Sequence, residues 1–154
     1  MTKLFIKIDD LSGGEVIALL EEHLADMFAT SPPESVHALD VQALKADNIT
    51  FFSGWIGKDL AGCVAIKALN SADCELKSMR TSRAFRGQGV ASQLLLFALE
   101  HAKIAGFSSV SLETGTQDYF SAARQLYKKF QFEDCGPFSH YTLDPNSHFM
   151  TRAL

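Results

Sequence analysis

The stretch Arg86-Gly87-Gln88-Gly89-Val90-Ala91 decides the fold of this chain. It stands between a strand-like run, Glu75–Thr81, and a long apolar segment with helical periodicity. This order predicts a strand, a glycine turn and the N-terminus of a helix. Glycine lets the backbone approach a ligand closely, and the first turn of a helix leaves N–H groups without carbonyl partners. The stretch therefore predicts a site for a phosphate group.

Two nucleotide-binding loops share glycines with this stretch but differ from it elsewhere. A P-loop ends in Gly-Lys-Ser/Thr, which is missing here. A dinucleotide-binding fold places an acidic residue about 20 positions further on, at the end of a second parallel strand. Glu113 comes slightly late for that role, and the rest of the βαβαβ series is absent. An ordinary strand-to-helix turn remains the alternative to a phosphate site.

Two motifs in register resemble one family. The pattern Arg86-x-x-Gly89-x-Ala91 is similar to the Gln/Arg-x-x-Gly-x-Gly/Ala motif with which GNAT N-acetyltransferases bind the pyrophosphate of acyl-CoA. Downstream, Ala123–Phe132 is similar to the family's Ala-x-x-Leu-Tyr-x-x-x-Gly-Phe segment, at the separation that one helix and one strand require. The resemblance covers nearly the whole chain. More narrowly, Pro32–Leu39 and Asp144–Ser147 resemble a bacterial subgroup of small-molecule acetyltransferases, some of which are labelled as acting on indole-acetic acid.

Two positions depart from the family pattern. The glycine that usually precedes Phe132 is Gln131 here, so we expect the turn after that helix to be made differently or with strain. The asparagine that often opens the same helix is Phe120, which puts a common CoA contact from that position in doubt.

Composition describes one globular domain, which we expect to span residues 1–154. The chain has 47% apolar residues, including 12 Phe, and can bury a sizeable core. Its net charge of −4 argues against a nucleic-acid surface. Met1–Ile8 carries Lys3 and Lys7 and has no long apolar run, so we expect neither a signal peptide nor a membrane span, and a cytoplasmic location.

The three cysteines have no Cys-x-x-Cys spacing, so the sequence predicts neither disulfides nor a metal site. None of them has a His, Asp or Glu at a recognisable spacing, which argues against a covalent acetyl-cysteine route. The sequence leaves open whether the protein forms a homodimer.

Periodicity along the chain predicts an α+β (α/β) fold. Ser12-Gly13-Gly14-Glu15 has the spacing of a capping box and opens a helix. Gly106 ends the helix that begins at Gly89, and a further helix is expected over Tyr119–Phe130. Strands are expected at Leu4–Ile8, Ile49–Ile56, Leu60–Ala68, Cys74–Thr81, Ser109–Glu113, Phe132–Cys135 and Phe149–Leu154. The resemblance implies a GNAT-like mixed sheet of six to seven strands, flanked by about four helices. The sheet is mostly antiparallel, and its fourth and fifth strands form a parallel, splayed pair.

The resemblance also implies where acetyl-CoA binds, as the co-substrate and without a metal. The pyrophosphate lies on the glycine loop, and the pantetheine arm runs beside the strand that ends at Thr81. The expected cofactor-binding residues are Met79, Thr81, Arg86, Gly87, Gln88, Gly89, Val90, Ala91 and Ser92.

Acetyl transfer to an amine needs a base for the amine and an acid for the departing thiolate. The resemblance places Tyr127 beside the sulfur as the acid. For the base we select Glu75, acting directly or through water, with Glu113 as the second candidate. We expect His37, His140 and Tyr141 to line the acceptor pocket.

The sequence thus predicts an N-acetyltransferase acting on a primary amine of a small molecule by direct attack in a ternary complex. The departures at Phe120 and Gln131 motivate an alternative from another class, a non-catalytic acyl-CoA-binding regulatory module. A protein or peptide N-acetyltransferase is the third hypothesis. The late loop Gly136–Ser147 favours a small acceptor, because we expect it to close over the pocket.

Overall fold

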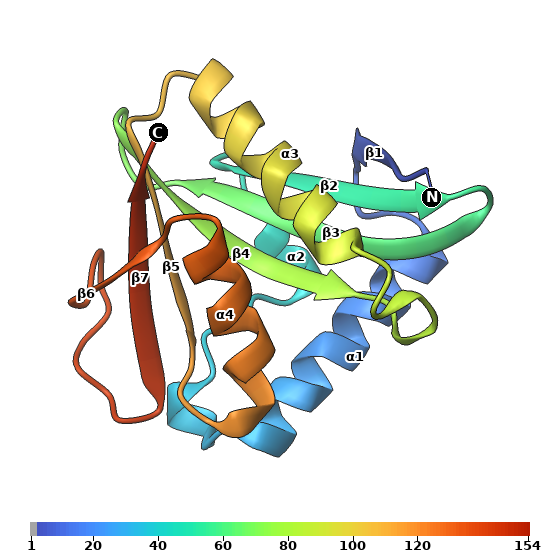
Figure 1. Ribbon diagram of the computed structural model, residues 1–154. Coiled ribbons are helices and arrows are strands. Elements are labelled where there is room, and N and C mark those ends of the chain that lie inside the picture. Colours follow the sequence, from blue (N-terminus) through green and yellow to red (C-terminus); the bar gives the residue numbers. More distant parts are fainter. Residues whose placement is uncertain (1–2) are drawn as a thin grey trace.

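The computed structural model describes residues 3–154 as a seven-stranded sheet with helices on both faces (Figure 1). The strands are β1 (Phe5–Ile8), β2 (Ile49–Ile56), β3 (Asp59–Ala68), β4 (Asp73–Thr81), β5 (Ser109–Gly115), β6 (Glu133–Cys135) and β7 (Ser147–Ala153). Their spatial order is β1-β2-β3-β4-β5-β7-β6, and every pairing is antiparallel except that of β4 with β5. The predicted mixed sheet with one parallel pair is confirmed. Met1 and Thr2, which begin the N-terminal segment considered above, lie outside the described residues.

Two hydrophobic clusters, one on each face of the sheet, pack the helices against the strands. The helices are α1 (Gly14–Thr30), α2 (Val41–Leu44), α3 (Val90–Ile104) and α4 (Ser121–Lys129). Helices α3 and α4 contribute to one cluster, and α1 and α2 contribute to the other. Successive side chains of a strand point to opposite faces, so Val64 of β3 joins the first cluster while Cys63 and Ala65 join the second. No helix within residues 3–154 combines the length and the apolar character needed to cross a membrane.

The start of α1 differs from the prediction. Gly13 is the N-cap, and no side chain caps the helix. The Ser12 hydroxyl, which the capping box requires, instead donates to Asp10 Oδ1 at 2.5 Å, within a tight turn in which the Leu11 N–H donates to Asp9 Oδ1 at 2.8 Å. The capping-box prediction is wrong because local aspartates compete for the serine.

Element boundaries near the C-terminus also differ slightly from the prediction. The expected helix Tyr119–Phe130 is a 3-10 turn, Asp118–Phe120, followed by α4. Strand β7 begins at Ser147, two residues before the predicted start at Phe149. As a result, the loop between β6 and β7 is one residue shorter than the predicted loop, Gly136–Ser147.

Strands β4 and β5 separate part-way along their length. They pair in parallel only at Asp73 with Ser109, Cys74 with Val110 and Glu75 with Ser111. Beyond Glu75, β4 continues to Thr81 along β3, whereas β5 continues to Gly115 along β7. The two strands therefore splay, as predicted, and the space between them opens toward their C-terminal ends (Figure 1).

A bulge interrupts β4 on its other side. Lys77 pairs with Ala65 and Arg80 pairs with Cys63, which leaves Ser78 and Met79 without partner residues on β3. Ser78 has a φ of 53°, in the left-handed region, and its carbonyl accepts a bond from Cys63 Sγ at 3.2 Å. A bulge re-aims the side chains that follow it.

Gln131 makes the turn that glycine makes in the family pattern. Its φ is 70°, the Phe132 N–H donates to the Tyr127 carbonyl at 3.0 Å, and the Gln131 N–H donates to the Lys128 carbonyl at 2.9 Å. These two bonds are those of a Schellman helix end, in which glycine usually takes the left-handed residue. The expected strain is therefore present, and the turn itself is kept.

We expect Gln131→Gly to raise the free energy of unfolding by about 1 kcal/mol, because a non-glycine residue in the left-handed region costs roughly that much. Urea denaturation would measure the difference. The matched control is Gln131→Ala, which keeps a Cβ and should leave the stability nearly unchanged. Equal stability of all three proteins would show that the turn carries no such strain.

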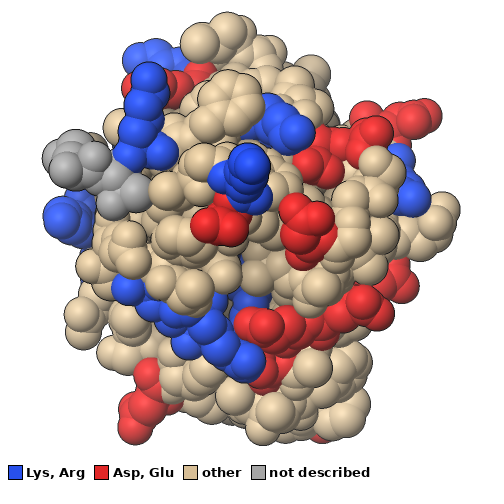
Figure 2. All heavy atoms as spheres, turned by 90° about the vertical axis from the view of Figure 1, so that its right-hand side faces the viewer, with Lys and Arg blue, Asp and Glu red and all other residues tan. Residues whose placement is uncertain are grey.

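Charged side chains of both signs share the face turned toward the viewer in Figure 2. Lysine and arginine side chains form separate groups there, with aspartate and glutamate side chains beside them. Independently of this view, Arg83 pairs with Glu22 and Asp26, at 3.6 and 3.2 Å. Positive charge on this face is therefore local and does not form a continuous stripe.

Candidate active site

A cleft of about 430 Å³ occupies the space between the separated ends of β4 and β5. Helix α1 and the segment after it form one side, and the start of α4 forms another. The cleft reaches from the start of α3, where Arg86 and Ala91 line it, to the carboxylates of Glu75 and Glu113. One continuous cavity therefore joins the glycine loop to the predicted catalytic residues.

The glycine loop leaves the first turn of α3 open. Gly87 and Gly89 have φ values of 77° and 79°, which side chains rarely adopt, and Gly89 is the N-cap of the helix. The first helical bond runs from the Gln93 N–H to the Gly89 carbonyl at 3.2 Å. The N–H groups of the three residues between them consequently have no helical carbonyl to bond. An anion is stabilised there by these donors and by the helix dipole.

The predicted CoA-binding residues fall into two groups in the structure. Met79, Thr81, Arg86 and Ala91 line the cleft itself. The others surround its mouth or face elsewhere: the loop residues Gly87, Gln88 and Gly89 are exposed, the Val90 side chain is buried in the core, and Ser92 is half-buried outside the cleft lining. Val90 and Ser92 can reach a ligand only through the backbone or from the rim.

Glu75 lies at the centre of a buried polar cluster. Its Oε2 accepts bonds from the Tyr141 hydroxyl at 2.6 Å and from Lys77 Nζ at 3.2 Å. Lys77 also donates to the Tyr141 hydroxyl at 3.1 Å and to the His37 carbonyl at 3.5 Å. Glu75 is 1% exposed, and its Oε1 has no partner within residues 3–154. The cluster therefore joins β4 to the segment before α2 and to the loop before β7.

Glu113 and Tyr127 line the same cleft from β5 and α4. Burial raises the pKa of Glu113 to about 7, with the Glu75 and Asp144 charges adding to the rise and Lys77 opposing it. Burial, reinforced by the charge of Glu113, also raises the pKa of Tyr127, so its hydroxyl keeps its proton at neutral pH.

The predicted acceptor residues do not all reach the cleft. His37 lines it, and burial together with the Lys77 charge lowers the pKa of its imidazole. Tyr141 is buried behind the lining, where its ring meets His37 edge-on with 4.9 Å between centroids. His140 is exposed and stacks on Tyr141 at 4.7 Å, so it lies one layer away from the cavity. The expectation that His140 and Tyr141 line the pocket is corrected accordingly.

Hydrogen bonds fasten the two acceptor-side loops together. The Ser35 hydroxyl donates to Asp144 Oδ2 at 2.6 Å, and Asn146 Nδ2 donates to Ser35 Oγ at 3.4 Å. Ser35 is 6% exposed, so this part of the segment is not the exposed loop that its polarity suggests. The loop after α1 and the loop before β7 are thus joined where Ser35 and Asn146 line the cleft.

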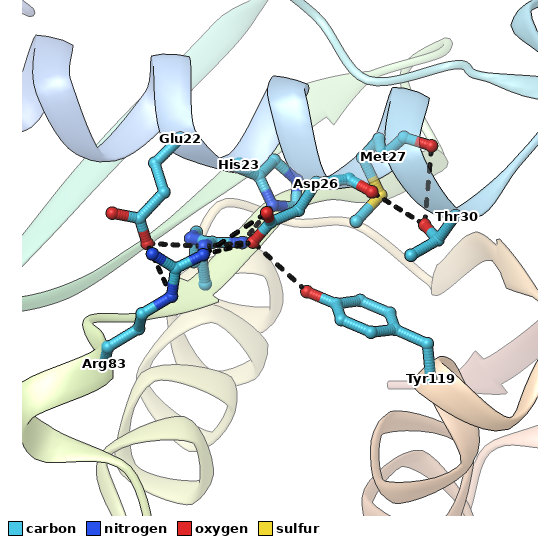
Figure 3. A network of polar contacts seen from close by, with 8 residues as sticks. Glu22, His23, Asp26, Met27, Thr30, Arg83 and Tyr119 are labelled. Carbon is cyan, nitrogen blue, oxygen red and sulfur yellow. Dashed lines mark hydrogen bonds and ion pairs between the residues drawn. The ribbon is translucent and has the colours of Figure 1, made fainter.

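Arg80 of β4 ties α1 to the sheet beside the cleft, and Figure 3 labels its partners Glu22 and Asp26. Its guanidinium donates to Glu22 Oε1 at 2.5 Å and to Asp26 Oδ2 at 2.6 Å, both on α1. The Tyr119 hydroxyl reaches Asp26 at 3.4 Å from the opposite side, as Figure 3 shows. His23 completes the group, and burial lowers its pKa to about 4, so this imidazole is neutral at pH 7.

Sequence reasoning missed Lys77, Ser78 and Arg80. The sequence did contain an indication of them, because β4 is a central strand of the sheet. Charged side chains are rarely buried in such a strand unless they have partners. Arg80 is 6% exposed, and the Lys77 side chain is 8% exposed. Charged residues in a strand predicted to lie mid-sheet could have marked this strand as the floor of a site.

Three comparisons with known proteins bear on the family. The model of the Acetyltransferase (GNAT) family matches residues 16–132. This chain belongs to the GNAT family. It is 49% identical over 151 residues to YsnE of Bacillus subtilis (strain 168), described as an uncharacterized N-acetyltransferase, with 98% of this chain and 100% of YsnE covered. It is 48% identical to YedL of Escherichia coli (strain K12), described in the same words, with 97% and 94% covered.

Further relatives extend the comparison. An IAA acetyltransferase of Azospirillum brasilense is 35% identical, with 91% of this chain and 89% of the relative covered. Among solved structures, a Bacillus subtilis acetyltransferase in complex with CoA has a TM-score of 0.70 at 18% identity, with 99% of each chain covered. A GNAT acetyltransferase from Elizabethkingia anophelis with acetyl-CoA bound has a TM-score of 0.71 at 14% identity, with 98% of each covered. The protein is an acyltransferase with the GNAT fold.

We expect Arg80→Leu to lower the free energy of unfolding by about 3 kcal/mol, because it leaves two partly buried carboxylates without their closest cation. Urea denaturation would measure the loss. Arg83→Leu is the matched control: it contacts the same carboxylates, but its side chain is 60% exposed. That change should cost less than about 1 kcal/mol. Equal losses for both variants would contradict the central place of Arg80.

Proposed function

We propose that this protein transfers the acetyl group of acetyl-CoA to a primary amine of a small molecule, by direct attack in a ternary complex. One observation carries the proposal. A single cleft joins the open N-terminus of α3 to Tyr127, Glu75 and Glu113, and it runs between strands whose pairing has stopped. The CoA and acetyl-CoA complexes of GNAT structures with the same fold support the choice of donor.

The residues present fit acetyl-CoA as the donor. The pyrophosphate would accept hydrogen bonds from the N–H groups at the start of α3 and would lie beside the Arg86 side chain. Within residues 3–154, Arg86 forms no ion pair. The pantetheine arm would lie along Met79 and Thr81. The N–H of Met79, a residue with no paired residue on β3, would donate to the thioester oxygen, a contribution of about 3 kcal/mol in comparable sites.

Tyr127 would protonate the thiolate of CoA as it departs. Tyr127 lines the cleft from α4, and its hydroxyl retains its proton because burial raises its pKa. An acid that stays protonated at neutral pH is available in every turnover. The acceptor's own proton needs a base, and both Glu75, which the sequence favours, and Glu113 line the cavity.

The fastened loops favour a small acceptor over a protein. An extended peptide needs an open groove, whereas the bonds between Ser35, Asp144 and Asn146 join the two loops over the acceptor end. The regulatory alternative is weakened by the same structure. Gln131 keeps the turn that glycine makes elsewhere, and Phe120 packs against Gly115 and lines the cleft.

Release of free CoA thiol from acetyl-CoA tests the proposed function. We expect purified protein to release CoA in proportion to enzyme concentration with at least one amine from a panel of polyamines, aromatic amines, sugar amines, amino acids and short peptides. Release only with peptides would favour a protein acceptor. Binding of acetyl-CoA without release in any mixture would favour the regulatory module.

We expect Tyr127→Phe to lower kcat about 100-fold while changing the affinity for acetyl-CoA little, because only the proton that stabilises the leaving thiolate is removed. Calorimetric titration with CoA would give the affinity, and thiol release would give kcat. Tyr119→Phe is a suitable control, since Tyr119 also lines the cleft but contacts Asp26 and not the predicted sulfur position. An unchanged kcat for Tyr127→Phe would exclude this residue as the acid.

A further inference from the structure

The cations that line the cleft are either already paired or lie at its donor end. Three lysine and arginine side chains line it within residues 3–154: Lys77, Arg80 and Arg86. Arg80 donates to Glu22 and Asp26, whose two negative charges exceed its own. Arg86 adjoins the glycine loop, where the pyrophosphate of acetyl-CoA would lie. Lys77 is therefore the one cation of this lining that could meet an acceptor.

Lys77 has no N–H group left for an acceptor. An ammonium group has three donors. Those of Lys77 reach Glu75 Oε2 at 3.2 Å, the Tyr141 hydroxyl at 3.1 Å and the His37 carbonyl at 3.5 Å. The Lys77 side chain is 8% exposed, and its charge is balanced by Glu75, whose side chain is 1% exposed. A carboxylate that entered the cleft would have to displace Glu75 from Lys77 to find a cation.

The acidic side chains of the lining are not fully paired. Glu75 Oε1 has no hydrogen-bond partner within residues 3–154. Glu113 also lines the cleft, and no ion pair in that part of the chain includes it. The two histidines of the lining are neutral at pH 7, because burial lowers the pKa of His23 to about 4 and, together with the Lys77 charge, lowers the pKa of His37. The acceptor end thus presents negative charge and no available cation within residues 3–154.

We propose that the cleft selects amines that carry no carboxylate group, and that Glu75 sets this preference by neutralising Lys77. This inference rests on the proposed function and narrows its acceptor class to amines with uncharged substituents, such as alkylamines, amino alcohols and amides of amino acids. A free amino acid would bring its carboxylate toward Glu75 and Glu113 without a counter-ion. Specificity then comes from the rejection of an anion, not from a dedicated contact with the acceptor.

Two acceptors that differ in charge test this selection. β-Alanine and β-alaninamide have the same length, but only the first carries a carboxylate. Thiol release is compared at equal concentrations of the neutral amine and at about pH 8, where Glu113 is deprotonated because its pKa is about 7. We expect kcat/KM to be about 30-fold higher for the amide, the size expected of an unpaired like charge in a partly buried site.

Glu75→Gln tests the origin of the selection. Lys77 then keeps its charge without a balancing carboxylate, so the preference for the amide should fall about 10-fold. A loss of turnover common to both acceptors cancels in this ratio. Glu113→Gln removes the other acid and should also lower the preference, which keeps the test valid if Glu75→Gln fails to fold. Glu100→Gln is the matched control, because Glu100 is exposed on α3 outside the cleft lining, and it should leave the preference unchanged.

Equal kcat/KM for the two acceptors, or a higher value for β-alanine, would overturn the proposal while the transferase function stood. A preference that is the same in wild type, Glu75→Gln and Glu113→Gln would overturn it as well. Binding gives a reading that needs no turnover: in calorimetric titrations of the CoA-bound protein, N-acetyl-β-alaninamide should bind more tightly than N-acetyl-β-alanine. If the amide binds more tightly but wild-type protein releases no CoA with any amine, the proposed function fails and the charge selection stands.

Discussion

The end of the parallel pairing between β4 and β5 is the constraint on which the active site depends. Three residue pairs hold these strands together, and beyond Glu75 each strand follows a different neighbour. The bulge at Ser78 and Met79 acts on the other edge of the same strand. Beyond Glu75, the backbone N–H and C=O groups of β4 on the side of β5 therefore have no partner strand within residues 3–154. Buried backbone groups without a hydrogen-bond partner are unfavourable. A ligand that lies along β4 can satisfy these groups, which a closed sheet could not offer.

The acceptor end of the cleft combines ionic groups in a way that separates their roles. Lys77 neutralises Glu75 within a buried cluster, so this pair stabilises the loops and keeps its own charges balanced. Glu113 lines the same cleft without a lysine or arginine at ion-pair distance within residues 3–154, and burial raises its pKa to about 7. The two carboxylates thus differ in their surroundings, because only Glu75 has a cation bonded to it.

Most of the fold could be predicted from the sequence, and part of the site could not. The Gly87–Gly89 loop, the helix end at Gly106 and the β-branched and aromatic runs of β2 and β3 are local features of the sequence, and the structure keeps them. The positions of Tyr141 and His140 depend on a loop more than 60 residues away from Glu75 in the sequence, which no periodicity describes. The capping box failed for a related reason, because Asp10 competes for the same serine hydroxyl. The sequence shows the charged residues of β4, but it does not show that Arg80 pairs with Glu22 and Asp26 of α1.

The bond between Ser35 and Asp144 joins positions 109 residues apart in the sequence, and Ser35 lines the cleft at the end where we propose that the acceptor binds. The donor side of the cleft is built from β4 and the start of α3 and shares no residue with this contact. If the acceptor and acetyl-CoA bind at these two ends as proposed, paired changes in the two surface loops would alter the acceptor while the acetyl-CoA side stays constant. A substitution in only one of these loops would disturb the other as well. Swapping one loop alone would then be a poor way to transfer acceptor range between relatives.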